Sequence, residues 1–531
     1  MSHGARRFWG ALLLSLTASG AAVGSAPGAA STPPPDLDAY VARVLKTFDV
    51  PGVGLAIVKD GAVVAARGYG VRRLGDPTPV DARTLFGIAS NTKLFTATAL
   101  GLLVEEGRLD WDAPVIRYLP WFAMWDPFVT RELTVRDLLV HRSGLGLGAG
   151  DLLWWPRSTY DAKEIVRRLR YVQPATSFRS AFAYDNVLYL VAGQVIEAVS
   201  GQTWEDFVTS RILKRVGMAA SDAHLSAASR GGNIASPHMR FDDGVRPVAP
   251  FDGDTTDPAG GINSSAEDMA KWVLVQLGQG RLADGTQLFS PATWRQLTAM
   301  VTPIPAAETP DEIAPFRTSF YGYALGVYTR EYRGHKLVYH SGGLPGFVSR
   351  VAMIPDANVG VVVLTNQGSR GAFDAIALHV LDYYLGAPPF DWVEGFHRLD
   401  ARAAADTAEA ERRSQGARDR SSKPSLPLTK YAGTFRDAWY GDIVIAEQNG
   451  KLTMTFTKSP SLVGDLEHWQ HDAFYVRWRD RELQADAFVG FALKPDGSID
   501  AAKMWPASPL VDFSYDFEDL LLTPVREGDR R

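Results

Sequence analysis

The sequence predicts an α/β (α+β) protein with two domains. The first would have an antiparallel sheet flanked by helices and a helical subdomain, and the second would be small and all-β. Strand-like apolar runs occur near both ends of residues 36–390, with helical patterns between them. Beyond residue 427 the pattern changes to short alternating strands separated by turns. At 531 residues and 46% apolar content, the chain can bury a large core.

The first 30 residues have the pattern of a secretory signal peptide. Arg6-Arg7 precede a short apolar run, and small residues follow as far as Ala30. The alternative is an N-terminal membrane anchor, but the apolar run is short for a bilayer span. We therefore expect residues 1–30 to be a signal peptide and the mature protein to be exported, either to the periplasm or out of the cell. We expect no membrane span after cleavage.

Composition excludes several classes of protein. The chain has no cysteine, which rules out disulfides, a cysteine nucleophile and thiolate metal sites. The net charge is -5 with both signs spread along the chain, so no basic stripe indicates a nucleic-acid partner.

The first domain has a clear order of expected elements. A hairpin is predicted at Asp60-Gly61, because Asp-Gly between two apolar runs favours a tight turn. The sheet would be assembled from the first and last strands, with the helical middle on its flank. The predicted helices are 36–48, 133–141, 160–171, 187–200, 266–277 and 373–385, and the predicted strands are 53–58, 62–66, 336–340, 348–354 and 360–365.

The C-terminal part divides in two. Residues 391–427 read as a helical segment and linker, and residues 428–525 as a small β-barrel with turns at Asn449-Gly450 and Asp496-Gly497. This domain could shield a cleft, mediate oligomerisation or only stabilise the first domain. The sequence leaves the oligomeric state open, a homo-oligomer included.

Residues 141–156 contain three features that carry no clear function. The glycine run 144–150 lacks the Gly-Lys-Ser/Thr ending of a phosphate-binding loop, so we reject that interpretation. His141 is expected to be a structural hydrogen-bonding residue. The aromatic loop 152–156 would either pack in the core or line a cleft.

The strongest chemical signal is Ser90-Asn91-Thr92-Lys93 at the start of a predicted helix. Residues three apart share a helix face, so Ser90 Oγ and Lys93 Nζ can meet where the helix N-terminus offers positive potential. That arrangement suits a hydroxyl nucleophile with an amine base. The structural alternative is a capping serine beside a solvated lysine.

Two further motifs follow in order. Tyr184-Asp185-Asn186 places a phenol, which can shuttle a proton, close to an amide, which can hold a carbonyl or a lysine. His340-Ser341-Gly342-Gly343 sits at the end of a strand and leads into a predicted glycine-rich turn, where glycines would let a substrate lie against the strand edge. The structural alternatives are a helix cap and a tight turn.

Other catalytic schemes find no support. The chain contains no Gly-x-Ser-x-Gly elbow and no His-Glu-x-x-His zinc motif. Acyl transfer through Ser90 would use neither a metal nor an organic cofactor, and we expect none.

The order Ser-x-x-Lys, Tyr-x-Asn, His-x-Gly resembles the serine β-lactamase-like superfamily of penicillin-binding proteins. The similarity covers roughly residues 36–390. It is greatest to the class C β-lactamase-related branch of esterases and D-aminopeptidase-like enzymes (peptidase family S12 type). The segment from Tyr431 to Phe435 resembles the start of the lipocalin-like β-domain that follows the hydrolase domain in some members.

The resemblance implies a role for each matched residue. Ser90 would form an acyl-enzyme, Lys93 would be its base, and Tyr184 would relay a proton to the leaving group. Asn186 would contact the substrate carbonyl or Lys93. The backbone N–H groups of Ser90 and Gly343 would form the oxyanion hole, with His340 and Gly342 beside the substrate.

One departure concerns substrate choice. Lactamases and transpeptidases usually have lysine in the third motif, where this chain has His340, which is largely neutral near pH 7. The expected substrate is therefore a small-molecule ester, amide or peptide. The alternatives are a β-lactamase or D-Ala-D-Ala carboxypeptidase and, as a different class, a non-catalytic binding or assembly protein on the same scaffold.

Overall fold

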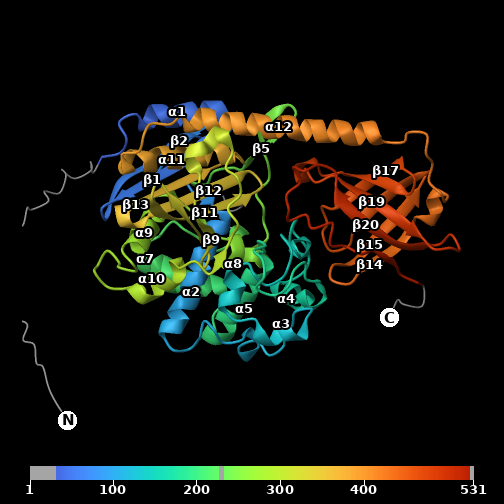
Figure 1. Cartoon of the computed structure of the whole chain (residues 1–531), viewed down its shortest axis with the longest axis horizontal. Helices are drawn as coiled ribbons and strands as arrows, with labels where there is room; N and C mark the ends of the chain where they lie inside the picture. Colours follow the sequence, from blue (N-terminus) through green and yellow to red (C-terminus); the bar gives the residue numbers. More distant parts are fainter. Residues whose placement is uncertain (1–31, 227–231, 527–531) are drawn as a thin grey trace, which may run out of the picture.

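The computed structural model describes residues 32–226 and 232–526, and the predicted signal peptide lies outside these ranges. A large domain with a central sheet is joined by one long helix to a separate all-β domain, shown in red in Figure 1. This arrangement confirms the predicted fold class. None of the helices in the described ranges is long and apolar enough to cross a membrane.

The central sheet of the described chain has nine antiparallel strands. The first strand pairs with a late one, Val53 opposite Thr365, which confirms the expected assembly from both ends of the domain. In spatial order the strands are β3 (Asp76–Pro79), β2 (Ala62–Arg73), β1 (Gly52–Lys59), β13 (Val359–Thr365), β12 (Phe347–Ile354), β11 (His335–Leu344), β10 (Tyr328–Tyr332), β9 (Tyr321–Tyr323) and β8 (Thr302–Pro303).

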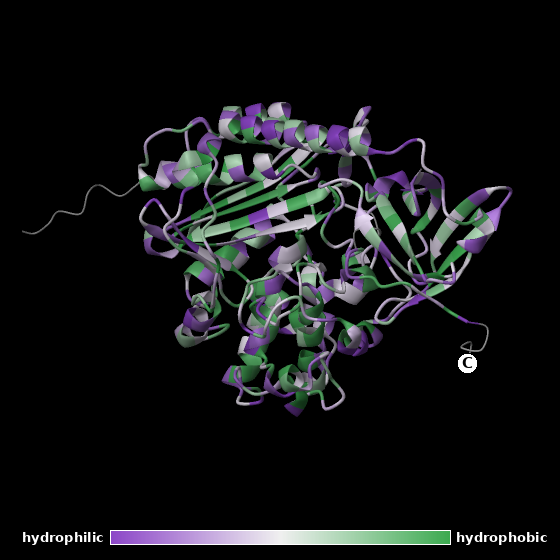
Figure 2. Ribbon diagram, turned by 45° about the vertical axis from the view of Figure 1, so that its right-hand side comes forward, coloured by the Kyte–Doolittle hydropathy of each residue, from purple (hydrophilic) through white to green (hydrophobic). Residues whose placement is uncertain are grey.

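Both faces of this sheet are buried, which explains why its central strands are almost continuously apolar. Alternate residues of a strand point to opposite faces. On β1, Leu55 and Ile57 face α1 (Leu37–Phe48) and α11 (Arg370–Leu385), whereas Ala56 and Val58 belong to the core on the other side. That second core includes α9 (Ala266–Leu277). Figure 2 shows hydrophobic residues along these strands.

The helical subdomain lies below the sheet in Figure 1 and carries α2 and α5 at its centre. The glycine after α5, Gly201, ends it in the left-handed conformation, as expected of a helix C-cap. The segment predicted as helix 133–141 forms only a 3-10 turn, Arg136–Leu139. The helices are α2 (Lys93–Glu105), α3 (Pro127–Glu132), α4 (Ala162–Arg168), α5 (Val187–Ser200), α6 (Trp204–Val208), α7 (Lys214–Val216), α8 (Asp257–Gly260) and α10 (Pro291–Thr298). Two two-stranded sheets complete the domain, β4 (Phe86–Gly87) with β7 (Asn263–Ser264) and β5 (His238–Phe241) with β6 (Gly244–Pro247).

Helix α12 (Trp392–Ala417) connects the two domains across the top of Figure 1. Its 26 residues span about 39 Å at about 1.5 Å each. Only its first turns are buried, against α11, through Trp392, Val393 and Phe396. The rest is exposed and polar, so α12 acts as a spacer and contributes little to the core.

The β-domain is an eight-stranded antiparallel sheet that closes on itself. A bridge between Ala502 and Leu522 joins the last long strand to the segment that pairs with the first. The turn at Asn449-Gly450 has positive φ at both residues, as the hairpin signal predicts. The strands are β14 (Gly433–Asp437), β15 (Gly441–Gln448), β16 (Lys451–Phe456), β17 (Val463–Gln470), β18 (Ala473–Trp478), β19 (Ala487–Leu493), β20 (Ile499–Pro506) and β21 (Thr523–Pro524).

The β-domain also packs directly against the helical subdomain, beside α4. Tyr160 Oη donates to the carbonyl of Tyr440 (2.6 Å), and Arg168 Nη1 donates to the carbonyl of Trp439 (2.9 Å). One continuous apolar cluster runs from α2 and α5 into the barrel. The two domains therefore share a core in addition to their connection through α12.

Candidate active site

Ser90 lies on a 3-10 turn, Ala89–Thr92, that leads directly into α2. The preceding residue, Ala89, has a φ of 49°, a left-handed conformation that is costly for a residue with a Cβ. This sharp turn between β4 and α2 leaves Ser90 on the wall of a cavity of about 300 Å³. Ser90 thus sits on a strained turn just ahead of helix α2.

The turn is fixed to the sheet by buried hydrogen bonds. Asn91 Nδ2 donates to Ser349 Oγ (2.7 Å), and Ser349 Oγ donates to the carbonyl of Ile88 (2.6 Å). On the other side, the backbone N–H of Ile262 donates to Thr92 Oγ1 (3.2 Å). These contacts hold Ser90 in place from both flanks.

The Lys93 amine has three close oxygen neighbours. It lies 3.1 Å from Ser90 Oγ, 2.8 Å from Asn186 Oδ1 and 3.0 Å from the carbonyl of Ala259. The last two oxygens can only accept hydrogen bonds, so they take two N–H groups. When the amine is neutral, its lone pair therefore faces the hydroxyl proton of Ser90.

The electrostatics of the site favour that neutral amine. Lys93 is 0% exposed, and burial lowers its pKa to about 7, against the opposing charges of Asp151 and Asp185. Those two carboxyl groups are also fully buried, and burial raises the pKa of each to about 7. Near neutral pH, the Lys93 amine is therefore neutral in a large fraction of the molecules and can accept a proton.

Tyr184 faces both members of this pair. Lys93 Nζ lies 4.9 Å from the Tyr184 ring centroid, and the Ser90 hydroxyl interacts with the phenol. Burial raises the Tyr184 pKa well above its usual value, so the phenol stays protonated. Its oxygen makes no hydrogen bond of ordinary geometry within the described ranges, which leaves it free to bond a substrate or leaving group.

Strand β11 forms another wall of the cavity that Ser90 lines. The sequence predicted a glycine-rich turn after His340, and this is wrong: Gly342 and Gly343 lie inside β11, paired with Ser349 and Val348 of β12. Glycine is needed at position 342 because the strand packs closely on the Ser90 turn: a Cβ there would lie 2.2 Å from the carbonyl oxygen of Ile88. Gly343 has open space instead, toward the cavity that it lines.

His340 is a neutral component of this wall. Its Nδ1 donates to the carbonyl of Ser341 (2.6 Å), so its Nε2 accepts from the Tyr323 hydroxyl (2.9 Å). Burial, helped by the charge of Lys93, holds the His340 pKa well below its usual value. No fixed cation therefore occupies the position where β-lactamases and transpeptidases usually have lysine.

His141 lies behind the site and is fully buried. Its Nδ1 accepts from the backbone N–H of Asp185 (3.1 Å), and its ring stacks at a tilt near Tyr184, with centroids 4.2 Å apart. It supports the Tyr-Asp-Asn segment and does not line the cavity.

Several residues that line the cavity were missed from the sequence. Arg370, at the start of α11, is a cation on its rim, and three residues of the β-domain, Asp512, Phe513 and Ser514, reach it from the other domain. Trp154 and Trp155 of the aromatic loop are both buried and line the cavity, so both suggested roles hold.

Asp151 was also missed, although it is linked to two predicted residues. It accepts a hydrogen bond from Asn186 Nδ2 (2.8 Å), whose amide oxygen contacts Lys93. The sequence holds no local signal for it, because an aspartate after the glycine run 144–150 is an ordinary loop residue.

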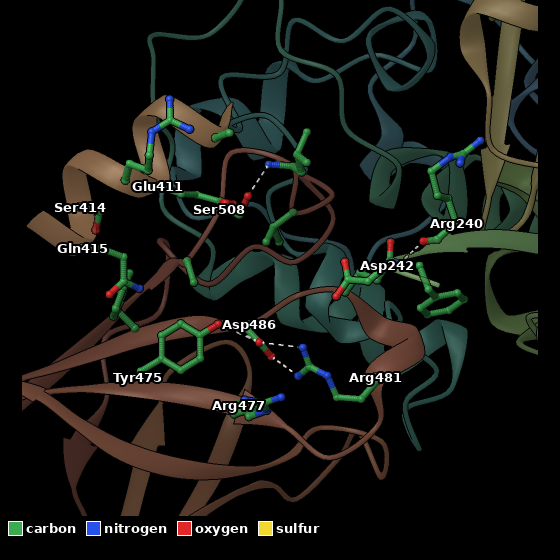
Figure 3. Close-up of a pocket in the computed structure, with 18 of the residues that line it drawn as sticks. Arg240, Asp242, Glu411, Ser414, Gln415, Tyr475, Arg477, Arg481, Asp486 and Ser508 are labelled. Carbon is green, nitrogen blue, oxygen red and sulfur yellow. Dashed lines mark hydrogen bonds and ion pairs between the residues drawn. The ribbon is translucent and has the colours of Figure 1, made fainter. Parts of the chain in front are cut away.

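A larger groove of about 1320 Å³ lies between α12, the β5–β6 hairpin and the β-domain, and Figure 3 shows its lining. It contains none of the motif residues. Its side chains are charges of both signs, among them Arg481, which forms a bidentate pair with Asp486, and Arg477 nearby (Figure 3). This groove carries no recognisable catalytic group.

One group of described residues has donor atoms that a divalent cation accepts: His224, Asp254 and Asp257, with ligand atoms within 4.8 Å of one another. The carboxylates already accept hydrogen bonds from backbone. Asp254 Oδ1 accepts from the N–H of Ser226 (2.8 Å), and Asp257 Oδ1 accepts from that of Leu225 (3.1 Å). These bonds hold the segment around Leu225, which lines the cavity.

Comparison with known proteins agrees with this geometry. The sequence profile of the Beta-lactamase family matches residues 37–384, and the chain belongs to that family. A second profile, a domain of unknown function called DUF3471, matches residues 417–524. The chain is therefore a serine hydrolase of the β-lactamase and penicillin-binding-protein type with a C-terminal all-β domain.

Among its relatives is the unguisins hydrolase ungD of Aspergillus violaceofuscus, which is 30% identical over 90% of this chain and 88% of that protein. Protein flp of Staphylococcus aureus is 26% identical over 63% of each chain.

Two solved structures are similar in fold. The octameric penicillin-binding protein homologue from Pyrococcus abyssi has a TM-score of 0.59 at 22% identity, covering 92% of this chain and 99% of its own. A class C β-lactamase from Rhodobacter sphaeroides has a TM-score of 0.52 at 23% identity, covering 66% and 99%.

Proposed function

We propose that this protein is an exported serine hydrolase that cleaves ester or amide and peptide bonds through a Ser90 acyl-enzyme, with Lys93 and Tyr184 as acid and base. The observation that carries the proposal is the environment of the Lys93 amine. It is fully buried, it is held by two carbonyl oxygens, and it presents its remaining position to Ser90 Oγ. That arrangement keeps a lysine base ready for one hydroxyl.

Acylation follows from this geometry. As Ser90 Oγ attacks the substrate carbonyl carbon, its proton passes to the neutral Lys93 amine, which becomes an ammonium. The backbone N–H groups of Ser90 and Gly343 donate to the developing oxyanion. When the tetrahedral intermediate collapses, the alcohol or amine leaves with a proton from Tyr184, which Lys93 replaces. An ester between Ser90 and the acyl group remains.

Deacylation uses the same groups in reverse. A water molecule attacks the acyl carbon and gives its proton to Tyr184 as Tyr184 passes its own proton to the neutral Lys93 amine. The acid leaves when the ester bond to Ser90 breaks, and Ser90 Oγ takes its proton back from the Lys93 ammonium. Because burial keeps the Tyr184 phenol protonated, we assign the resting base role to Lys93 and the relay role to Tyr184.

The cavity wall indicates the kind of substrate. Trp154, Trp155, Phe182 and Phe513 line it, so an apolar acyl or side-chain group gains free energy by leaving water there. The neutral His340 offers no fixed charge to a carboxylate. The names of two relatives, both unguisins hydrolases, support hydrolysis as the activity class.

One observation favours a second candidate, a β-lactamase or D-Ala-D-Ala carboxypeptidase. Arg370 on the cavity rim is a cation that could hold a substrate carboxylate in place of the missing lysine. Covalent labelling of Ser90 by a fluorescent penicillin, followed by rapid hydrolysis, would favour this candidate over an esterase or peptidase.

The test is the variant Ser90→Ala assayed on activated esters and D-amino-acid amides, with fluorophosphonate labelling mapped by mass spectrometry. We expect labelling at Ser90 in the wild type and a loss of turnover of at least about 10⁴-fold in the variant. Unchanged turnover in Ser90→Ala would end the proposal, and absent labelling of the wild type would revive a non-catalytic binding role.

Export and assembly need separate experiments. Export predicts a mature N-terminus after cleavage within residues 20–31, which N-terminal sequencing of the secreted or periplasmic protein would locate. A homo-oligomer stays a prediction, and light scattering on the purified protein would measure its mass.

A further inference from the structure

The glycine run that matched no known loop is the docking site of a β-domain segment. Gly148 and Gly150 have φ values of 69° and 81°, and a Cβ on Gly148 would lie 2.7 Å from the carbonyl oxygen of Phe513. The N–H of Gly150 donates to Asp516 Oδ2 (2.7 Å). Glycine is thus required here because two backbones from different domains meet at close contact.

This docking places Ser514 on a buried carboxylate next to the catalytic residues. Ser514 Oγ donates to Asp151 Oδ2 (2.8 Å), and Asn186 Nδ2 donates to the same oxygen (2.8 Å). Trp154 Nε1 donates to Asp151 Oδ1 (3.0 Å). All of these contacts are buried, and Ser514 is 4% exposed.

The contact fixes the orientation of the Asn186 side chain. An amide has one acceptor end and one donor end. Because the donor end of Asn186 is bound to the Asp151 carboxylate, its oxygen must face the Lys93 amine, where it accepts at 2.8 Å. A continuous chain therefore runs from Ser514 through Asp151 and Asn186 to Lys93 and Ser90.

We propose that the C-terminal β-domain sets the protonation state of the catalytic lysine: Ser514 holds Asp151, and Asp151 acts on Lys93 by its charge and through Asn186. Asp151 and Ser514 are positioning residues, since neither bonds Ser90. This inference rests on the proposed function, because it assigns a control to the base of that reaction.

The direction of the effect follows from the charges. An ionised Asp151 favours the ammonium form and so raises the pKa of Lys93, in opposition to burial. Each hydrogen bond that Asp151 accepts from Ser514 or Asn186 favours its ionised form. Loss of the Ser514 hydroxyl therefore makes Asp151 easier to protonate and Lys93 easier to deprotonate.

Other titratable groups face the same lysine. They are the carboxyl group of Asp185, the imidazoles of His141 and His340, and the phenols of Tyr184 and Tyr189; Asp516 of the β-domain faces Asp151. Of the groups facing Lys93 in the described ranges, Asp151 is the one that accepts a hydrogen bond from a β-domain side chain. The proposed influence of the β-domain on Lys93 therefore acts through Asp151.

The experiment measures how fast a fluorophosphonate modifies Ser90 in the full-length protein as a function of pH, between about pH 5 and pH 10. The variants are Asp151→Asn, Ser514→Ala and Ser514→Thr, which keeps the hydroxyl. Ser508→Ala is the matched control, because Ser508 lies near the same segment and lines the distant groove of Figure 3. Thermal unfolding of each variant is recorded in parallel.

In Asp151→Asn we expect the acid limb of the pH profile, where the rate of Ser90 modification rises as Lys93 loses its proton, to shift to lower pH by about one unit. Ser514→Ala should move it in the same direction by less. Ser514→Thr should keep the limb at the wild-type pH because it keeps the hydroxyl, whatever its rate, and Ser508→Ala should leave both the rate and the limb unchanged. Slower modification with an unmoved limb in Asp151→Asn and Ser514→Ala would mean a merely structural role and would overturn the inference. If Asp151→Asn does not fold, the two Ser514 variants decide the question. A wild type that is not modified at all would instead refute the proposed function.

Discussion

Two hollows of the described structure differ in size and in how far their charged side chains are buried: one is large and its charges are exposed, and the other is small and its lysine is buried. The groove between α12 and the β-domain is about 1320 Å³, and the cavity at Ser90 is about 300 Å³. In the groove, the side chain of Arg481 is 47% exposed and pairs with Asp486, whereas Lys93 in the cavity is 0% exposed. An exposed ion pair contributes little free energy, because water screens it.

The smaller hollow is distinguished by the exclusion of water from its lysine. Burial lowers the pKa of Lys93 to about 7, so that the amine can accept a proton near neutral pH. Volume alone would have selected the wrong hollow.

Removing the amine should have the largest effect. In Lys93→Met the side chain keeps its approximate volume but has no base, and we expect kcat/KM on an activated ester to fall by about 10³-fold. Circular dichroism checks that the variant is folded. Activity within tenfold of the wild type would show that Lys93 is not the base.

Removing the Tyr184 phenol oxygen should reduce activity by less than removing the Lys93 amine, because Tyr184 relays a proton that Lys93 supplies. For Tyr184→Phe we expect kcat to fall by about 10²-fold on a substrate with a poor leaving group. The loss should shrink with an activated ester, whose leaving group needs no proton. Equal losses on both substrates would contradict the relay.

The two glycines of β11 should respond differently to the same added methyl group. In Gly342→Ala the Cβ would lie 2.2 Å from the Ile88 carbonyl oxygen, so we expect a loss of unfolding free energy of about 1–3 kcal/mol and a displaced Ser90. Gly343→Ala has open space and should stay within about 0.5 kcal/mol of the wild type. Thermal unfolding measures both, and the reverse order would refute the close contact between β11 and the Ser90 turn.

We expect the smallest change in activity for a substitution in the larger hollow, the groove beside α12. Arg477→Ala removes an exposed groove cation, and kcat/KM should stay within about twofold of the wild type. A tenfold change would mean that the groove contributes to catalysis and would remove the contrast between the two hollows.

Local patterns were enough to predict much of the fold and part of the site. The Asp60-Gly61 turn, the strand pairing across the domain and the helix after Asn186 depend on turn chemistry and apolar periodicity, which neighbouring residues carry. The contact of Ser90 with Lys93 needed only three residues of sequence separation.

What the sequence did not predict depends on contacts between distant segments. Ser514 and Asp151 are 363 residues apart, and the packing of two domains brings them together. The glycines of β11 looked like a turn because their true cause, the Ile88 backbone, lies on another element. Arg370 is likewise placed at the cavity only by tertiary structure.

The account depends most directly on the protonation of one amine, which NMR can observe. With lysines labelled at Cε with ¹³C, and the Lys93 signal assigned by its absence in Lys93→Met, a pH titration reports the pKa of that amine. We predict a midpoint near pH 7 for Lys93. A midpoint at the ordinary lysine value of about 10.4 would contradict it, because the amine would then be an ammonium whenever Ser90 has to lose its proton.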